Sequence, residues 1–599
     1  MPQPSNKLSQ FWQELKRRNV TRVLAVYIAA AFMILELITM ISEPFGLPEG
    51  SLKVAFIISL AGLVIAVIVS WVYDIHPEGG LVKTEPAQKV NTEDLPKSSY
   101  SWKLASYISF VVIVGLIGLN IFGNRNQIKI DESFAKSLAV LPFHNYTGDS
   151  NQDFICLGLT DEIISHLYKI ESFDEVRSLT SVLAYKDSDL STTEIAEELN
   201  VNYILEGSYK RMGDEIRITA QLIEPNNDKH IWLQDYDLPY KKIIGIPANI
   251  ALQIANHLKA YLTNSETHNI QKISTTNITA YEFYLRGIDS YYLHTDFEKS
   301  AGYFEEAIQF DSTYALAYSY LAQCYQFIAR YSLSSFSSNE NAHSKAKGAA
   351  QKAYELDPLL GEALAVFGLI LAEDWEIYAP EELFNRAVKL SPGSPEVYSS
   401  FAQYLRWLGR YDESISFAQK ALELDPLNHM SYQWLAVFYS YAGHFDKSNQ
   451  QLEKVLELKP DFMHAHGLYA INYLLMGEYD RALDYANMTM STALISDIPI
   501  LLLSPMTMIY AKAGFDNKAH ALLEEMLELS HNQFVDPVYL AGAYSGLGEN
   551  EIAMSYLAKA FELRSGQMIY LRAYGDWIFK DLSSDPRYTD LLEKIGFKE

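Results

Sequence analysis

The stretch from Pro392 to Pro426 reads PGSPEVYSSFAQYLRWLGRYDESISFAQKALELDP and contains the unit that the C-terminal half of the chain repeats. Proline returns every 34 residues, each time after an apolar segment, at Pro358, Pro392, Pro426 and Pro460. A proline ends a helix because its ring removes a hydrogen-bond donor and clashes with the preceding turn. Glycine recurs at the same interval, with an aromatic residue two positions later: Gly409, Gly443 and Gly477, followed by Tyr411, Phe445 and Tyr479. This period predicts a solenoid of stacked antiparallel helix pairs.

The repeated unit resembles the tetratricopeptide family, in which a small residue in the second helix lets neighbouring helices approach. That position is occupied by Ala307, Ala353, Ala387, Ala421 and Ala560. The register predicts eight repeats over residues 278–567 and a C-terminal cap over 568–599, which covers the last apolar face. The second repeat holds twelve extra residues, which we expect to form a Ser-rich loop at 331–342.

A solenoid of this kind offers a concave groove lined by the first helix of each pair. Tyrosine, tryptophan and arginine dominate the energetics of protein interfaces, so their presence on these helices predicts a surface that binds a protein or peptide. The alternative is that each side chain packs against an adjacent turn of the solenoid. The predicted groove residues are Tyr292, Gln323, Gln403, Arg406, Trp407, Gln433 and Tyr441.

Residues 131–265 have the pattern of a small α/β domain. Strands are predicted at 137–143, 175–179, 202–212, 215–223 and 230–236, and helices at 153–170, 192–200 and 241–262. Apolar and polar residues alternate from Ile216 to Leu222, which is typical of a half-buried hairpin strand. The predicted order is β-α-β-α-β-β-β-α.

Several segments of this domain are similar to the bacterial TolB amino-terminal-like family. They are SLAVLPF from Ser137, GLTDE from Gly158, LEGS from Leu205, GDEIRITAQL from Gly213 and HIW from His230. In that family the domain often joins C-terminal tetratricopeptide repeats to a class III nucleotide cyclase or a winged-helix DNA-binding domain. The resemblance therefore implies, as an alternative to a scaffold, a sensory or regulatory component of a pathway related to nucleotide cyclases or transmembrane transcription regulators. Only about 22 residues precede the first apolar run, too few for either output domain.

Three apolar runs in residues 1–130, at 23–42, 54–73 and 104–123, have the length of transmembrane helices. Nine basic residues flank the runs on the N-terminal side of the predicted membrane and four on the other, which predicts a cytoplasmic N-terminus. The sequence thus predicts a multi-pass protein of the bacterial inner membrane, with its lipid contacts in these three helices and its later domains in the periplasm. Glu36 lies inside the first run, where we expect it to fix helix packing rather than to relay protons.

The net charge of −26 disfavours nucleic acid as a partner, because it repels the phosphate backbone. Residues 1–130 contain 12 Lys and Arg against 9 Asp and Glu, so the rest of the chain carries 36 against 65, a net charge of −29. The two cysteines, Cys156 and Cys324, fall in different predicted domains and form no disulfide framework.

No spacing of residues predicts a metal or a cofactor, and we expect no enzymatic activity. Asp161, Glu162 and His166 share one predicted helix, and Asp149 and Asp153 flank Gly148, but neither set pairs a nucleophile with a base. Carboxylates at the start of a helix more often act as caps and dipole partners. The histidines of the repeats are expected to be packed or solvated: His429, His444, His464 and His466.

Overall fold

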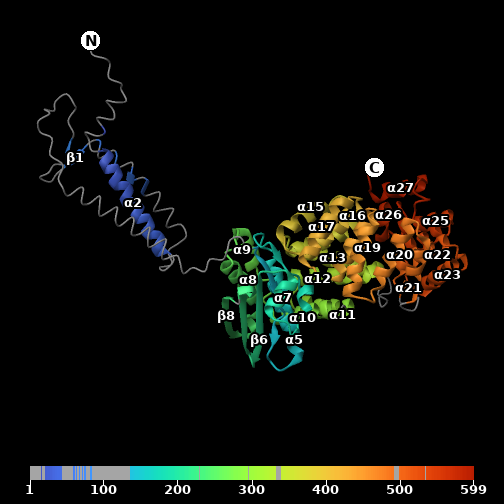
Figure 1. Cartoon of the computed structure of the whole chain (residues 1–599), viewed down its shortest axis with the longest axis horizontal. Coiled ribbons are helices and arrows are strands. Elements are labelled where there is room, and N and C mark those ends of the chain that lie inside the picture. The colour runs from blue at the N-terminus through green and yellow to red at the C-terminus, as the bar shows by residue number, and fades with distance from the viewer. Residues whose placement is uncertain are drawn as a thin grey trace, which may run out of the picture. The chain divides into compact units, whose positions relative to one another are not determined.

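The computed structural model describes residues 15, 20–42, 59–60, 62–63, 67, 71, 73–75, 81–83 and 135–598, except 228, 295, 332–338, 492–497 and 533. The chain forms two compact units, residues 1–130 and 131–599. Most of the second unit is a helical solenoid, and a small sheet domain precedes it (Figure 1). Most of the predicted Ser-rich loop at 331–342 lies outside the described residues.

In the first unit, helix α2 spans Val20–Ser42, and strand β1 (Tyr73–Ile75) pairs antiparallel with β2 (Leu81–Lys83). None of the helices that the structure describes combines the length and apolar character that a bilayer crossing demands. The prediction of three transmembrane helices is therefore wrong, and so is the multi-pass inner-membrane location with periplasmic domains that was derived from it.

An apolar run of sufficient length is only one of the conditions for a bilayer crossing, and the structure describes the three predicted runs to different extents. The second predicted span, 54–73, is mostly outside the described residues, and its last residue, Tyr73, belongs to strand β1. The third, 104–123, lies entirely outside them, as does the side chain of Glu36. The first, 23–42, falls within α2.

The sheet domain has strands in the order β5-β3-β6-β7-β8, with β4 pairing with β6. β3 lies parallel to β5 and β6, whereas β6, β7 and β8 form an antiparallel meander. The strands are β3 (Ser137–Val140), β4 (His144–Asn145), β5 (Glu175–Val176), β6 (Tyr203–Met212), β7 (Glu215–Glu224) and β8 (Lys229–Pro239). Ile216, Ile218, Ala220 and Leu222 point into the core of the domain, as their alternation with polar residues requires.

The helices of this domain are α5 (Asp153–Leu167), α6 (Leu179–Leu183), α7 (Thr192–Leu199), α8 (Ile246–His257) and α9 (Asn264–Gln271). Helix α6 was not predicted from the sequence. The single helix predicted at 241–262 is divided into a 3-10 turn (Tyr240–Gly245) and α8, because Pro247 favours the start of a helix. Helix α5 packs against α8 and also against α10, the first helix of the solenoid. Gly158 permits this contact, because a Cβ there would lie 2.3 Å from a methyl group of Leu285.

The described residues of the solenoid form eight antiparallel helix pairs. The pairs are α10 (Ile278–Asp289) with α11 (Phe297–Phe310), α12 (Ala315–Tyr331) with α13 (Asn339–Leu356), α14 (Gly361–Glu373) with α15 (Pro380–Leu390), α16 (Pro395–Trp407) with α17 (Tyr411–Leu424), α18 (His429–Tyr441) with α19 (Phe445–Leu458), α20 (Met463–Met476) with α21 (Tyr479–Ser491), α22 (Ile500–Lys512) with α23 (Asp516–Asn532), and α24 (Pro537–Gly546) with α25 (Asn550–Glu562). Three short helices follow: η8 (Gly566–Tyr570), α26 (Leu571–Tyr574) and α27 (Pro586–Ile595). A π-helical turn, η6 (Ser290–His294), extends α10.

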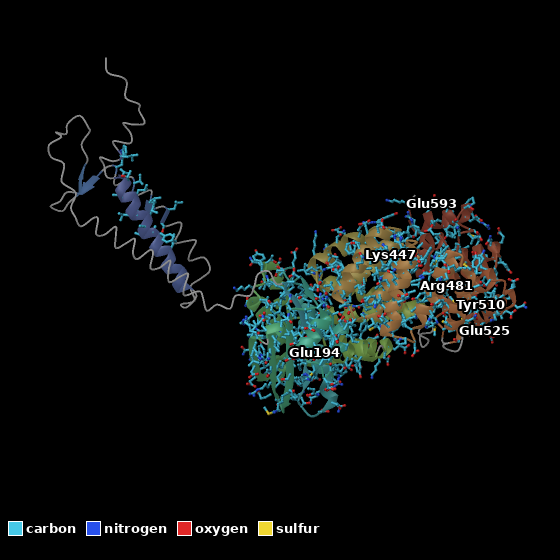
Figure 2. All side chains as sticks on the ribbon, in the orientation of Figure 1. Glu194, Lys447, Arg481, Tyr510, Glu525 and Glu593 are labelled. Atoms are coloured by element: carbon cyan, nitrogen blue, oxygen red, sulfur yellow. The ribbon has the colours of Figure 1, made fainter. Side chains whose placement is uncertain are left out.

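The periodic glycines end the first helix of the last five pairs in the left-handed conformation. Gly409, Gly443, Gly477, Gly514 and Gly548 have φ between 75° and 81°. A residue with a Cβ is strained in this conformation, whereas glycine is not. This explains why glycine recurs at this position of the repeat. The alanines at the predicted close-approach positions are 0–2% exposed. Charged side chains such as Lys447, Arg481 and Glu593 lie on the outside of the solenoid (Figure 2).

The superhelix closes on itself, because its C-terminal elements return to the third and fourth helix pairs. The Trp375 ring stacks on Phe561 at 5.2 Å between centroids, and its Nε1 donates to the Ser565 carbonyl at 3.3 Å. The backbone N–H of Lys598 donates to the hydroxyl of Tyr378 at 3.1 Å. The concave side of the solenoid is thereby bounded by the C-terminal helices.

Candidate functional site

The superhelix bounds a cavity of about 920 Å³ that is open to solvent on part of its surface. Its walls include the first helices of six pairs, α12, α16, α18, α20, α22 and α24, together with η6, the C-terminal elements η8 and α26, and helix α6 of the sheet domain. Most of the lining side chains are aromatic or aliphatic, among them Phe327, Trp434, Ile471, Tyr539 and Trp577. We call this space the central cavity.

Five of the seven predicted groove residues line the central cavity: Tyr292, Gln323, Arg406, Gln433 and Tyr441. The other two, Gln403 and Trp407, do not. Trp407 has no exposed surface, and its ring meets Tyr570 edge-on at 5.6 Å between centroids. It follows Arg406 directly, and one residue turns a helix by about 100°, so that neighbouring residues face different directions.

Arg406 has the most unusual environment in the central cavity. Its side chain is 3% exposed, and the guanidinium carbon lies 4.8 Å from the ring centroid of Tyr441, 5.1 Å from that of Tyr570 and 5.7 Å from that of Phe438. In the described part of the chain, its Nε and Nη2 atoms have no hydrogen-bond partner. Three aromatic faces stabilise the cation, and among the described residues no carboxylate forms an ion pair with it.

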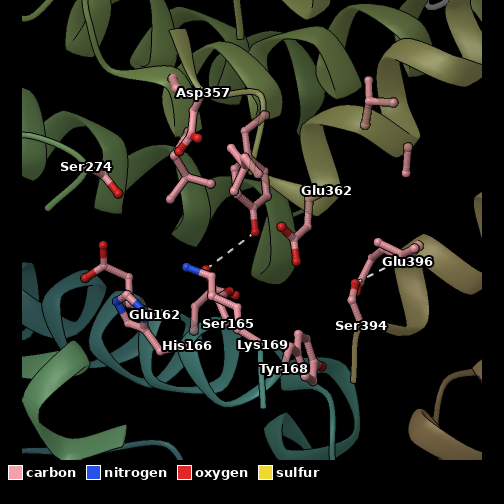
Figure 3. A pocket seen from close by; sticks show the side chains of 18 of the residues that line it. Glu162, Ser165, His166, Tyr168, Lys169, Ser274, Asp357, Glu362, Ser394 and Glu396 are labelled. Atoms are coloured by element: carbon pink, nitrogen blue, oxygen red, sulfur yellow. Dashed lines mark hydrogen bonds between the residues drawn. The ribbon is translucent and has the colours of Figure 1, made fainter. Parts of the chain in front are cut away.

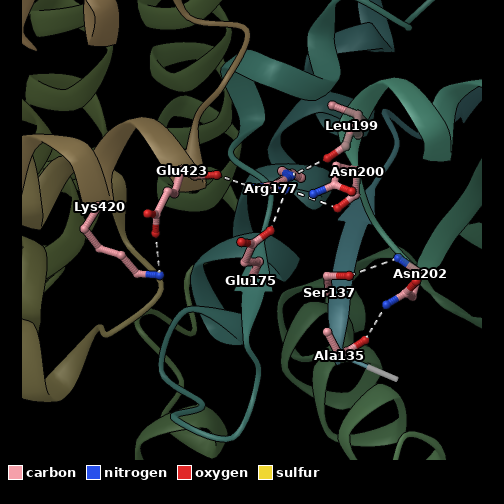
Figure 4. Close-up of polar contacts among 9 residues, drawn as sticks. All are labelled: Ala135, Ser137, Glu175, Arg177, Leu199, Asn200, Asn202, Lys420 and Glu423. Atoms are coloured by element: carbon pink, nitrogen blue, oxygen red, sulfur yellow. Dashed lines mark hydrogen bonds and ion pairs between the residues drawn. The ribbon is translucent and has the colours of Figure 1, made fainter. Parts of the chain in front are cut away.

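The sheet domain is fixed to the solenoid by a second set of polar contacts, on the loop between α17 and α18. Arg177 is 3% exposed and donates from Nε to the Leu199 carbonyl at 2.7 Å and from Nη1 to the Glu423 carbonyl (Figure 4). Its Nη2 pairs with Glu175 at 2.5 Å. The planar guanidinium therefore ties strand β5 and the end of α7 to the end of α17.

Asp425 completes this junction. It is 3% exposed and accepts hydrogen bonds from the hydroxyls of Ser178, Thr180 and Ser181 and from the side-chain amide of Asn428. The Thr180 and Ser181 oxygens lie 2.7 Å from their nearest carboxylate oxygens. A buried carboxylate is stable when it is fully hydrogen-bonded, as here. No local sequence pattern predicts the contacts of Asp425 with residues 178–181, because these residues precede it by 244–247 positions.

A smaller cavity of about 240 Å³ lies between helix α5 and the solenoid helices α12, α14 and α16. Glu162 and His166 on α5 and Lys169 just after it line this space together with Asp161, and Glu362 on α14 and Glu396 on α16 line it from the solenoid (Figure 3). Burial raises the pKa of Glu162 and of Glu396 to about 7 and raises the pKa of Asp161 well above its usual range. The same loss of hydration lowers the pKa of His166 well below its usual range.

These groups belong to a buried interface, in which hydroxyl groups donate to the carboxyl groups. The hydroxyl of Tyr281 donates to Glu162, and that of Tyr320 donates to Asp161 at 3.5 Å. Glu396 accepts from the hydroxyl of Ser394 at 2.9 Å. Tyrosine and serine here act as donors to carboxylates. Across the described residues, no group of three or more His, Cys, Asp or Glu side chains is arranged to hold a metal ion.

The raised pKa of Glu162 leads to a pH-dependent stability. The folded chain holds this proton to about pH 7, whereas an unfolded Glu loses it near pH 4.5, so the folded state binds more protons between these values. The contribution of Glu162 to the free energy of unfolding therefore falls as the pH rises from 4.5 to 7. We expect Glu162→Gln to raise the unfolding free energy at pH 8 by up to about 3 kcal/mol, and to have no such effect at pH 4.

Denaturant unfolding at the two pH values measures this effect. Glu525→Gln, at an exposed site (Figure 2), is the matched control and should change the unfolding free energy at neither pH. Equal stability of Glu162→Gln and the unsubstituted chain at pH 8 would contradict the prediction.

Family models match segments of both the sheet domain and the solenoid. A family model described as the HilA/YgeH-like transcriptional regulator, second domain, matches residues 134–245. Two tetratricopeptide repeat models match residues 395–426 and 417–450. The resemblance of the sheet domain to the TolB amino-terminal-like family stays a prediction.

A curated relative and several solved structures are similar to parts of the chain. "Putative adenylate cyclase 3" of Rhizobium meliloti (strain 1021) is 26% identical over 288 residues, which are 46% of this chain and 41% of that protein. Yeast Tom70 is 16% identical, with a TM-score of 0.32, over 59% of this chain and 85% of the other. PilF of Pseudomonas aeruginosa is 17% identical, with a TM-score of 0.27, over 37% of this chain and 92% of the other. With the two repeat models matched, the C-terminal part of the chain contains tetratricopeptide repeats.

Proposed function

We propose that the chain is a non-catalytic interaction scaffold that binds a segment of a partner protein in the central cavity. Tetratricopeptide repeats are generally protein-binding scaffolds, and two repeats of this chain match the family. The observation that carries the proposal is the central cavity itself, a concave space of about 920 Å³ with aromatic walls. Aromatic side chains bury a large area for little loss of conformational freedom, which suits a binding surface.

The test is capture of a partner by the full chain and by a variant of the cavity wall. Tyr292 and Gln323 line the central cavity, and Tyr291 donates to Gln323 at 3.3 Å. We expect the double variant Tyr292→Ala, Gln323→Ala to bind the partner roughly thirty-fold more weakly, which corresponds to about 2 kcal/mol. Glu525→Ala, on the outer surface, should bind as well as the unsubstituted chain. Equal capture by all three proteins would place the binding surface elsewhere.

A second candidate is a regulatory component of a signalling pathway related to nucleotide cyclases or transcription regulators. Two observations favour it: the match of residues 134–245 to a domain of HilA/YgeH-like regulators, and the partial similarity to a protein named a putative adenylate cyclase. In this case the chain alters the output of a separate catalytic or DNA-binding protein. Both candidates are non-catalytic, so we expect the full chain to produce no cyclic nucleotide. Production of a cyclic nucleotide would show that the chain is itself an enzyme and would contradict both.

A further inference from the structure

Glu396 is an exposed acidic residue at the start of helix α16, and it lines the central cavity. The smaller cavity beside helix α5 is lined by the same residue, and Tyr292 and Gln323 also belong to both linings. The two spaces therefore meet at these three side chains. The hydroxyl of Ser394 donates to the Glu396 carboxylate at 2.9 Å (Figure 3), and among the described residues no cationic side chain forms an ion pair with it.

The electrostatic surroundings of Glu396 favour a cation. Reduced hydration raises the pKa of Glu396 to about 7, and the carboxylates of Asp425 and Glu362 act in the same direction. A cation beside the carboxylate would favour the ionised form and lower this pKa again. Binding of a positively charged group at Glu396 therefore relieves a repulsion that the chain itself leaves in place.

The basic side chains of the two cavities act on other groups. Besides Arg406, they are His166, Lys169, Lys272, His429, Lys459 and His464. Burial lowers the pKa of the three histidines, so they are mostly neutral at pH 7. Lys272 pairs with Asp357 at 2.7 Å, and the carboxylate that acts most strongly on Lys169 is Glu362. The ammonium group of Lys459 lies 5.4 Å from the ring centroid of Phe462.

Aromatic side chains form the wall near the point where the two cavities meet. The hydroxyl of Tyr292 lies 3.5 Å from that of Tyr320, which lines the smaller cavity. Tyr291 meets Tyr292 edge-on at 5.1 Å between centroids and Phe297 at 5.5 Å, and Phe297 stacks on Phe327 at 4.7 Å. Aromatic faces attract cations and also cover apolar side chains. A carboxylate beside such a wall fits an ammonium or guanidinium group on an apolar body.

We propose that the partner segment in the central cavity is basic and apolar: a lysine or arginine of the segment pairs with Glu396, and its apolar side chains cover the aromatic wall. This inference rests on the function proposed above and specifies the chemistry of the segment. The net charge of −29 on residues 131–599 attracts a basic segment and disfavours an acidic one. Arg406 lies ten residues after Glu396, about 15 Å along α16, and disfavours a second cation at its own end of the cavity.

The experiment is selection of random octapeptides displayed on phage against the immobilised full chain, followed by sequencing of the bound pool. We expect Lys and Arg to be enriched at least about ten-fold over Asp and Glu, relative to the unselected library. The variant Glu396→Lys should reverse this preference. The matched control is Glu525→Lys on the outer surface (Figure 2), which changes the net charge equally and should select the same peptides as the unsubstituted chain.

Fluorescence anisotropy with one enriched peptide measures the ion pair directly. We expect Glu396→Gln to bind this peptide about ten-fold more weakly, and the unsubstituted chain to bind a peptide with its basic residue replaced by glutamine about ten-fold more weakly. The two changes together should cost no more than either alone, because each one already breaks the pair. Circular dichroism shows whether Glu396→Gln is folded, and its side-chain amide can still accept a hydrogen bond from Ser394.

The outcomes separate this inference from the function on which it rests. Enriched peptides without a basic preference, or a preference that Glu396→Lys leaves unchanged, would overturn the inference and leave the scaffold intact. Additive losses for the two glutamine changes would also overturn it. Absence of any enrichment over a support without the chain would refute the scaffold and this inference with it. If lysine amide alone displaces the enriched peptide at equal concentration, the occupant is a small organic cation and the proposal of a basic segment fails.

Discussion

Asp425→Ala is expected to loosen the junction between residues 178–181 and the end of α17 and to lower the free energy of unfolding by about 3–5 kcal/mol. The carboxylate accepts from three hydroxyls of the segment 178–181 and from Asn428. Removal of a buried charged acceptor leaves its donors unsatisfied, at a cost of about 1–3 kcal/mol for each group that water does not reach. Ser178 and Ser181 are both 0–1% exposed, so water cannot replace the lost oxygen atoms without opening the junction.

Hydrogen exchange locates this effect. The amides of residues 178–183 and 423–428 should lose protection together, because both segments depend on one carboxylate, whereas the amides of α20 and α22 should keep theirs. Asp425→Asn retains one acceptor oxygen and should lose less stability than Asp425→Ala. The control is Lys420→Ala, which breaks the exposed ion pair with Glu423 (Figure 4) and should change the unfolding free energy by less than about 1 kcal/mol. Unchanged protection at 178–183 in Asp425→Ala would show that the junction does not depend on this residue.

The repeat could be predicted from the sequence because it follows from local backbone requirements. A proline that ends a helix and a glycine at φ near 75° are conditions on single residues, and they recur with the period of the structure. The same holds for the alternation in strand β7, where every second side chain is buried. Such patterns are visible in one sequence because each is satisfied within a few residues.

Contacts between distant segments could not be predicted in this way. Trp375 and Ser565 are 190 residues apart, yet their hydrogen bond helps to close the superhelix. The junction through Arg177 joins positions separated by 246 residues. The sequence contains no local signal for either contact, since both depend on the accumulated rotation of several helix pairs. The central cavity, which this closure bounds, was for the same reason predicted only as an open groove.

The error in the N-terminal unit has a related cause. Hydropathy depends only on the composition of a window of residues, and three windows in residues 1–130 are apolar enough and long enough for a membrane span. A span also requires a continuous helix, which is a property of the backbone. The strand pairing of Tyr73 with Lys83 shows that the end of the second window adopts another structure.

Trp407→Ala is expected to lower the free energy of unfolding by about 3–5 kcal/mol, which makes this residue part of the core and not of a binding surface. Its indole has no exposed surface, and it packs on Tyr570 of η8 at the junction between α16 and the C-terminal helices. Truncation of a buried tryptophan costs the transfer free energy of the ring and leaves a cavity that the closed superhelix cannot collapse. The loss should therefore also loosen the closure, with faster hydrogen exchange in residues 566–574.

The variant Trp407→Phe distinguishes the contribution of ring packing to the free energy of unfolding from that of the indole N–H group. The indole Nε1 has no partner among the described residues, so phenylalanine removes an unsatisfied donor while it keeps most of the ring volume. We expect Trp407→Phe to cost less than about 2 kcal/mol, and both variants to retain partner capture under conditions in which they are folded. A Trp407→Ala variant that unfolds normally but loses the partner would instead place Trp407 in the binding surface, because only direct contact with the partner explains a loss of affinity without a loss of stability.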